Sequence, residues 1–334
     1  GLILLDEVLD RDIYQKPRHI VGLTAYPDIL DASAPRFTAD LWHVILYDLS
    51  SGTWTEQLQH KLRHILLAER NATGTAEYAT GLCIVTALQD PELNAVLDLP
   101  WEWKRFEFAN DGTIYHRGRF SRKGETFEVV AAAAARMGMP AAAVLSMKMI
   151  ATFRPRYLAI AGILAGVQGQ CELGDIIVAD PGWDYGSGKF QLNNGVPVFE
   201  SAPYQIALNS LVRGRLSLMA QDGTVLDEIR RSWQGVIPKT VLRMHLGPVA
   251  SGAAVLEDPA VLEVVRRQHR KLIGIEMETY GVLTAVEESA HPQPIAFSIK
   301  SVCDFANKDK NDDFRKYAAF TSAQALRLFV ERFI

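Results

Sequence analysis

The residues best suited to chemistry are acidic, and two of them lie one residue apart in the apolar stretch "GIEMETYGVL", residues 274–283. Glu276 and Glu278 flank Met277 in that stretch. A buried carboxylate costs free energy unless hydrogen bonds or an opposite charge compensate it. An acidic pair in apolar surroundings therefore indicates a site that needs negative charge.

Two more carboxylates stand at the ends of predicted strands. Glu92 follows the apolar strand predicted over 81–88, and Asp304 lies near the end of the strand predicted over 294–306. Side chains alternate along a strand, so Lys300 should share a face with Asp304 and orient the carboxylates. Ligands of α/β sheets bind beyond the strand ends. We expect Glu92, Glu278 and Asp304 to meet there; the alternative is a set of ion pairs that only closes the strand ends.

Motifs for other common chemistries are absent from the sequence. It contains no P-loop, GxGxxG, GxSxG or HExxH motif. The three cysteines, Cys83, Cys171 and Cys303, are far apart and form no CxxC pair. A zinc site and a disulfide framework are therefore not expected. We expect an enzyme without a metal or an organic cofactor.

Composition favours a globular protein of two domains. The 334 residues are 48% hydrophobic, and 35 basic against 39 acidic residues give a net charge of -4. This balance argues against nucleic acid as a partner, although it allows a local basic pocket. The most apolar stretches are too short to span a bilayer, and no signal-like leader is present. We expect a cytoplasmic protein without a membrane partner.

The order of predicted elements divides the chain at a polar linker over 71–80. Before it, strands over 2–8, 19–26 and 41–49 and a helix over 54–69 predict a small parallel sheet, the incomplete part of a domain. After it, residues 81–334 form a second domain. Its apolar strands over 81–88, 156–167, 173–180 and 294–306 alternate with helices, for example over 259–271 and 312–334. Such strands predict an α/β fold whose sheet is covered on both faces.

Four blocks of the second domain carry a family resemblance. "AGILAGVQGQCELGDIIVAD", "GPVASGAAVLED", "GIEMETYGVL" and "SIKSVCDFANKDKNDDFRKYAA" resemble, in order, the nucleoside phosphorylase and nucleosidase superfamily. They are most similar to the branch of methylthioadenosine/S-adenosylhomocysteine nucleosidase. The resemblance implies a three-layer α/β/α domain with a central mixed sheet. It also implies a homodimer, in which a loop of the neighbour closes the 5′ end of a purine nucleoside or nucleotide.

The resemblance assigns roles to the acids. Cleavage of a purine N-glycosidic bond passes through a positively charged sugar and a leaving base that must gain a proton. Glu278 would hold the ribose hydroxyls and stabilise that charge, with Met277 packed against the sugar. Asp304 would protonate the purine N7. Glu276 would be a solvated or helix-start acid, although some relatives use this residue in the sugar site.

The acid that activates water is offset in this sequence. Relatives carry a glutamate four residues after an alanine, whereas here Pro91 holds that position and Glu92 follows it. We assign the role to Glu92 across a one-residue insertion, with Asp90 as the alternative.

The resemblance also places residues around the ligand. Ala165 and Gly166 would form the close turn beside it, and Ser251, Gly252 and Val255 the purine pocket.

Cationic residues should identify the group at the 5′ end of the sugar. Lys189 follows a Gly-Ser-Gly stretch in the segment that resembles the closing loop, and Arg136 and Lys148 lie in another segment near the sugar. Trp183 and Tyr185 offer rings for the sugar or base. These cations favour phosphorylated adenine nucleotides over methylthioadenosine. Arg136 has no serine or threonine partner in "ARMGMPAAAV", which favours water over phosphate as nucleophile.

The first segment resembles part of a response-regulator receiver domain. Asp6 in "LILLDEVLD" would be the phosphoacceptor and Thr24 the switch residue, although the usual lysine after the last strand is absent. A receiver joined to a nucleosidase resembles effectors of Detocs-type bacterial antiphage systems, which cleave adenine nucleotides, ATP included. This implies an upstream kinase as partner. The alternatives to a hydrolytic nucleosidase are a phosphate-dependent phosphorylase and a non-catalytic nucleotide sensor.

Overall fold

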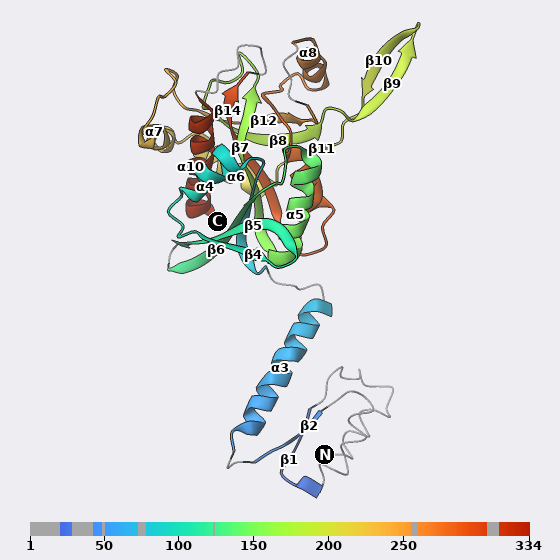
Figure 1. Cartoon of the computed structure of the whole chain (residues 1–334), viewed down its shortest axis with the longest axis vertical. Helices are drawn as coiled ribbons and strands as arrows, with labels where there is room; N and C mark the ends of the chain where they lie inside the picture. The colour runs from blue at the N-terminus through green and yellow to red at the C-terminus, as the bar shows by residue number, and fades with distance from the viewer. Residues whose placement is uncertain are drawn as a thin grey trace. The chain divides into compact units, whose positions relative to one another are not determined.

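The computed structural model describes residues 21–28, 43–48, 51–72, 78–122, 124–254, 259–305 and 314–334 (Figure 1). The chain divides into two compact units, Gly1–Ala76 and Glu77–Ile334. Of the helices in the described ranges, none combines the length and apolar character needed to cross a membrane.

The first unit contains a pair of parallel strands and a long helix. β1 (Val21–Thr24) pairs in parallel with β2 (His43–Leu46), and α3 (Thr53–Ala72) follows. The strands predicted over 19–26 and 41–49 and the helix over 54–69 are thus confirmed in type. Tyr47 and Trp54 pack edge to face with ring centroids 4.7 Å apart, which joins the end of β2 to the start of α3. The strand predicted over 2–8, with Asp6, lies outside the described residues.

The second unit is built on one mixed sheet. Within the described residues it has ten strands, in the order β11-β8-β12-β13-β7-β3-β6-β5-β4, with β14 paired to both β7 and β8. β3 runs parallel to β6 and β7, whereas β13 is antiparallel to β7. The strands are β3 (Thr80–Thr86), β4 (Lys104–Phe108), β5 (Asp111–Arg122), β6 (Glu125–Ala133), β7 (Pro155–Gly166), β8 (Ile176–Asp184), β11 (Gln205–Ile206), β12 (Met244–Ser251), β13 (Gly274–Glu276) and β14 (Ile295–Asp304).

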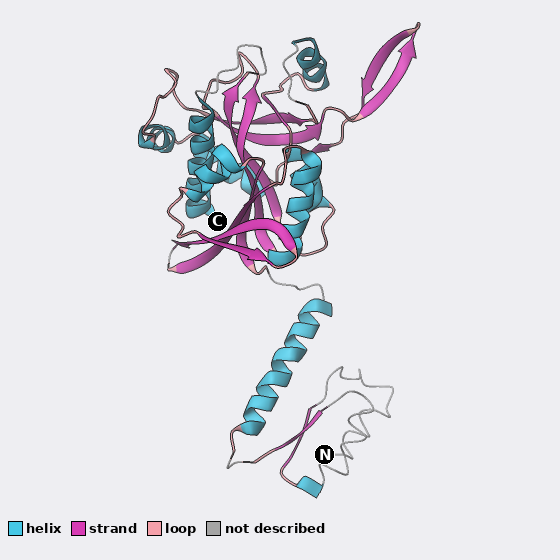
Figure 2. Cartoon of the chain, viewed as in Figure 1, coloured by secondary structure: helices cyan, strands magenta, loops and turns pink. Residues whose placement is uncertain are grey.

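Helices cover both faces of this sheet, as the apolar strands predict (Figure 2). Successive residues of β3 point to opposite faces. Leu82 and Ile84 belong to a core shared with α4 (Asn94–Leu97), α6 (Ser210–Ala220), α7 (Gly223–Ser232) and α10 (Arg315–Phe333). Cys83 and Val85 belong to the other core, shared with α5 (Met139–Phe153) and α9 (Thr279–Glu287). The site residues are therefore carried by strands that are fixed on both sides.

A separate hairpin forms in the segment that resembles the closing loop of the family. β9 (Gly188–Asn193) and β10 (Val196–Ser201) pair antiparallel and extend away from the sheet of the second unit (Figure 1). Asn194 and Gly195 have φ of 51° and 78°, as a two-residue turn of type I′ requires. The Asn-Gly pair therefore sets the tight turn between the two strands.

Candidate active site

Three buried charged residues meet where β13 ends and α9 begins. Lys300 of β14 places its Nζ 2.7 Å from Glu276 Oε2 and 2.8 Å from Glu278 Oε2. All three side chains are almost fully buried. Lys300 therefore orients both acids of the "EME" stretch, rather than Asp304 four residues later.

Glu276 is a buried helix-start acid and not a solvated one. Its Oε2 accepts the N–H groups of Glu278 (2.9 Å) and Thr279 (2.8 Å) as well as Lys300 Nζ. Its Oε1 accepts the hydroxyl of Ser251. Burial alone would raise the pKa of Glu276, but the charge of Lys300 and the hydrogen bonds from Lys300, Ser251 and the N–H of Glu278 together lower it. Four protein donors leave this carboxylate little capacity to bind a sugar.

Glu278 keeps acceptor capacity for a ligand. Its Oε1 accepts the N–H of Gly138 at 2.9 Å, and its Oε2 accepts Lys300. A carboxylate has about four lone-pair sites, so each oxygen can still take one hydroxyl proton. Sequence reasoning did not identify Gly138, which has a φ of 107° that favours glycine. The signal for it was the "GMP" break before α5, since a helix start with exposed N–H groups attracts anions.

Glu92 lies in the turn Gln89–Leu93, which is kinked at Asp90, where the backbone is extended (φ -122°, ψ 129°). Its Oε2 accepts the N–H groups of Ala87 and Leu88, both at 2.8 Å, and its Oε1 accepts that of Ile163, also at 2.8 Å. Asp90, the alternative, is exposed and accepts a hydrogen bond from the side chain of Asn94 instead.

The charges of Glu92, Glu278 and Lys300 influence one another. Burial raises the pKa of Glu92, the charge of Lys300 opposes that effect, and the charge of Glu278 adds to it. Burial would lower the pKa of Lys300, but Glu276, Glu278 and Glu92 together raise it, so Lys300 stays charged. Three carboxylates thus surround one ammonium. A carboxylate with a raised pKa in such a group is suited to accept a proton.

Asp304 lies at the end of β14, opposite Ala165 at the end of β7. The register between these strands shifts between Val302 and Asp304, which interrupts the alternation expected from Lys300 onward. The Cys303 thiol donates to Asp304 Oδ2 at 3.3 Å. Gly166 is packed so closely that a Cβ there would lie 2.5 Å from the sulfur of Cys171.

The structure places the residues expected around the base in several different environments. Ser251 is fully buried and its side chain belongs to the acid network, while the N–H of Gly252 donates to the Glu276 carbonyl at 3.0 Å. Trp183 is fully buried and donates to Gln268 at 2.9 Å, so it belongs to the core. Val255 lies outside the described residues.

The three candidate cations occupy different surfaces. Arg136 is exposed, two residues before Gly138. Lys189 is exposed on the hairpin, in register with Glu200. Lys148 lies 2.6 Å from Asp111 on the outer surface and, by hydrogen bonding to it, holds the pKa of that acid well below its usual value. Lys148 is thus engaged away from the acids.

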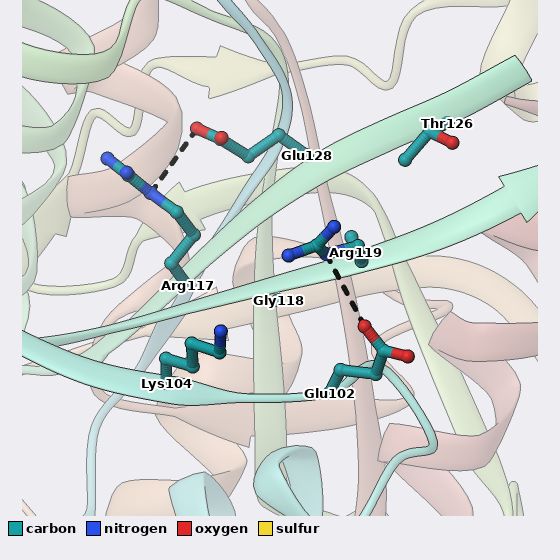
Figure 3. A pocket seen from close by; sticks show the side chains of 7 residues that line it. All are labelled: Glu102, Lys104, Arg117, Gly118, Arg119, Thr126 and Glu128. Carbon is teal, nitrogen blue, oxygen red and sulfur yellow. Dashed lines mark ion pairs between the residues drawn. The ribbon is translucent and has the colours of Figure 1, made fainter.

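A hollow of about 420 Å³ on strands β4 to β6 is separate from these residues (Figure 3). Two ion pairs cross its lining, Arg117 with Glu128 at 3.5 Å and Arg119 with Glu102 at 3.4 Å. Its cationic side chains are thus largely offset by acids. The lining residues are Glu102, Lys104, Arg117, Gly118, Arg119, Thr126 and Glu128.

Comparison with known proteins identifies a family and several relatives. Residues 82–334 match the profile of a family described as "Phosphorylase superfamily". The chain is 34% identical to an uncharacterized protein named y4jS from Sinorhizobium fredii, over all of this chain and 83% of that protein. It is 29% identical to the ATP nucleosidase Cap17 from Escherichia coli over 60% of this chain, a match that covers 40% of that protein.

The fold also matches a solved structure. The crystal structure of 5′-methylthioadenosine/S-adenosylhomocysteine nucleosidase from Helicobacter pylori superposes with a TM-score of 0.60. The match has 16% sequence identity and covers 76% of this chain and 99% of that one. At this identity the likeness concerns the fold alone.

Proposed function

This chain belongs to the phosphorylase superfamily, and on that premise we propose that it hydrolyses the N-glycosidic bond of adenine nucleosides or nucleotides. The observation that carries the proposal is the buried cluster of Glu92, Glu276 and Glu278 around Lys300. Asp304 stands at the end of β14, the strand that also carries Lys300. An ATP nucleosidase among the relatives supports the same class of reaction.

The residues divide the reaction between them. Water attacks C1′ of the sugar and gives a proton to Glu92, while the C1′–N9 bond breaks and its electron pair goes to the base. Asp304, in its protonated form, gives its proton to N7, so that neutral adenine leaves. Glu278 accepts hydrogen bonds from the ribose hydroxyls and stabilises the positive charge on the sugar. Solvent then returns the two acids to their starting states.

The charge of the cluster favours water over phosphate. Three carboxylates around one ammonium leave an excess of negative charge in a buried place. A phosphate dianion would be repelled there, whereas neutral water would not. Phosphorylysis therefore remains the second candidate only through Arg136, which is exposed near the start of α5.

We propose phosphorylated adenine nucleotides, ATP included, as the preferred substrates. Arg136 lies two residues before Gly138, whose N–H binds Glu278, so a cation stands close to the proposed ribose site. Lys189 lies on the exposed hairpin. In a homodimer, that hairpin of one copy would supply the lysine to the 5′ end of a nucleotide bound by the other.

Apolar surface supports the homodimer. Val144 and Met147 on the outer side of α5 are 59% and 42% exposed, and they form one stripe with the exposed residues Pro140 and Ala151. Spacings of three and four residues make a helix face suited to packing against a second helix. Since α5 begins next to Gly138, this interface would adjoin the site.

We further propose that residues 1–70 regulate the enzyme as a receiver-like segment, in a cytoplasmic bacterial antiphage system with an upstream kinase. The parallel pairing of β1 with β2 supports this. Asp6 would receive the phosphoryl group. Mass spectrometry after treatment with a small phosphoryl donor tests the assignment, and labelling that persists in Asp6→Ala would contradict it.

One assay tests the main proposal. The protein is incubated with ATP, AMP, adenosine or methylthioadenosine, with and without phosphate, and free adenine is measured. We expect release without phosphate and faster release from ATP than from methylthioadenosine. Absence of adenine with every substrate would favour a non-catalytic sensor, and a need for phosphate would favour a phosphorylase.

Two variants extend that assay. Lys189→Ala should lower ATP cleavage by about tenfold without affecting adenosine, since each contact to phosphate contributes about 1.5–3 kcal/mol. Lys148→Ala is the matched control, because its ammonium is engaged by Asp111.

Asp304→Asn should lower adenine release about 10²–10⁴-fold while ligand binding persists. Full activity in Asp304→Asn would mean that another group protonates the base.

A further inference from the structure

We infer that Tyr185 is a positioning residue for the base wall, residues 251–254 at the end of β12. Its ring and hydroxyl hold the bend there, and its backbone carbonyl binds the last residue of α8 (Pro259–Gln268). The inference rests on the proposed function and on the expectation from the sequence that Ser251 and Gly252 lie beside the base. Tyr185 directly follows β8 and is half-buried. Its contacts join the ends of β8, β12 and α8.

The first set of contacts fixes the bend after β12. The ring of Tyr185 lies against Gly252, where a Cβ would stand 1.9 Å from ring atom Cζ. Its hydroxyl donates to the carbonyl of Ala254 at 3.1 Å, and its backbone N–H donates to the carbonyl of Ser251 at 3.0 Å. A side chain at residue 252 and the ring of Tyr185 therefore exclude each other.

The second set of contacts fixes the end of α8. Gln268, the last residue of that helix, donates through Nε2 to the carbonyl of Tyr185 at 2.9 Å. Its Oε1 accepts the indole N–H of the fully buried Trp183, also at 2.9 Å. Gln268 is thus held by the core on one side and by Tyr185 on the other.

The bend that Tyr185 holds is continuous with the acid network. Ser251, directly before Gly252, donates its hydroxyl to Glu276 and accepts the N–H of Tyr280 at 2.9 Å. The N–H of Gly252 donates to the carbonyl of Glu276 at 3.0 Å. A displaced bend would therefore change how the base wall faces the acids, without removing any group that reacts.

Kinetics of matched variants test this role. Tyr185→Phe removes only the hydroxyl, and Tyr204→Phe is the control, because it removes a hydroxyl bond to Glu287 (3.3 Å) on an exposed surface. Tyr185→Phe should raise KM for adenosine about three- to tenfold, the effect of one lost hydrogen bond, with kcat within about twofold. Tyr204→Phe should change neither. A lower Tm with unchanged KM in Tyr185→Phe would overturn the inference.

A double variant tests the close approach itself. Gly252→Ala alone should raise KM more than Tyr185→Phe, because the added carbon occupies the place of the ring. Adding Gly252→Ala to Tyr185→Ala should cost nothing further, since the ring is already gone. Additive losses in the double variant would contradict the contact.

Hydrogen exchange without ligand separates this inference from the proposed function. Backbone amides of residues 252–254 should exchange faster in Tyr185→Phe than in the wild type or in Tyr204→Phe, whereas those of residues 266–268 should not change, because Gln268 binds the backbone carbonyl of Tyr185. Unchanged exchange would overturn the role of Tyr185 even in an active enzyme. A wild type that releases no adenine would instead contradict the proposed function, while faster exchange in Tyr185→Phe would still support the inference.

Discussion

Lys300 is a fully buried ammonium, and its two carboxylate partners are buried as well. Removing one member of a buried ion pair leaves an uncompensated charge, whereas an exposed pair contributes little. Lys148 offers the comparison within the same chain. It pairs with Asp111 at 2.6 Å, and its side chain is 44% exposed.

We predict that Lys300→Met destabilises the fold by about 3–5 kcal/mol and that Lys148→Met costs about 1 kcal/mol or less. Urea unfolding of both variants measures the difference. The double variant Lys300→Met with Glu276→Gln should recover part of the loss, because fewer buried charges are left unpaired. Equal effects of the two lysines would show that Lys300 is not buried with its partners.

The pH dependence of activity should follow Glu92. Burial raises the pKa of Glu92, and its proposed role requires the ionised form. We therefore expect kcat/KM to rise with pH through an apparent pKa above the ordinary value of about 4.3. A profile between about pH 4 and pH 9 checks this, and an acid limb at or below the ordinary value would contradict it.

The stability of the fold also depends on pH through Glu92, but it should fall with rising pH where activity rises. A carboxyl group whose pKa is raised on folding stabilises the fold below its unfolded pKa, and this contribution is lost as pH rises through the folded pKa. The stability of the wild type relative to Glu92→Gln should therefore decline with rising pH in that window.

At the scale of elements, the position of Glu92 depends on two strand ends. The kinked turn Gln89–Leu93 brings the carboxylate out after β3, and β7 receives it at Gly162 and Ile163 near its end. A Cβ at Gly162 would lie 2.1 Å from Glu92 Oε1. The glycine thus gives the carboxylate room to reach the N–H of Ile163.

We predict that Gly162→Ala lowers kcat for adenine release by at least about tenfold, since a misplacement of about 1 Å can cost about 10²-fold. Gly214→Ala is the control, because no atom lies within 4 Å of a Cβ there and residue 214 lies in α6. It should leave kcat unchanged and stabilise the helix by about 0.5–1 kcal/mol. Similar kcat values for both variants would show that Glu92 tolerates displacement.

For the second unit as a whole, the proposed dimer accounts for apolar surface left exposed in one copy. Phe190 and Leu192 on the hairpin are 80% and 73% exposed, and Val144 and Met147 on α5 are also open. A two-stranded hairpin is marginally stable by itself in water. A second copy packed against both surfaces would bury them.

We predict that the wild type sediments as a dimer and that Val144→Glu with Met147→Glu sediments as a monomer, because buried charges would oppose the interface. Leu218→Glu is the control, since Leu218 is 62% exposed on α6, which packs in the opposite core. Analytical ultracentrifugation reads the result. A dimer that survives the double change would place the interface elsewhere.

The sequence by itself determined the class of the fold and the acids worth testing. Apolar strands such as 81–88 and 156–167 must be covered on both faces, so their residues predicted the layered sheet. The acids at the strand ends could be identified because a carboxylate in apolar surroundings costs free energy unless hydrogen bonds or an opposite charge compensate it. The hairpin, the strands β4 and β5, and helices α6 and α7 were not predicted, since exposed residues interrupt their apolar patterns.

The tertiary structure alone decided what each acid contacts. The N–H of Gly138 reaches Glu278 across 140 residues of sequence, and that of Ile163 reaches Glu92 across 71. Lys300 pairs with Glu276 and Glu278 rather than with Asp304, because a shift in strand register follows Val302. Local spacing cannot predict such partners, since hydrogen bonds and ion pairs form between groups that only the packed sheet brings together.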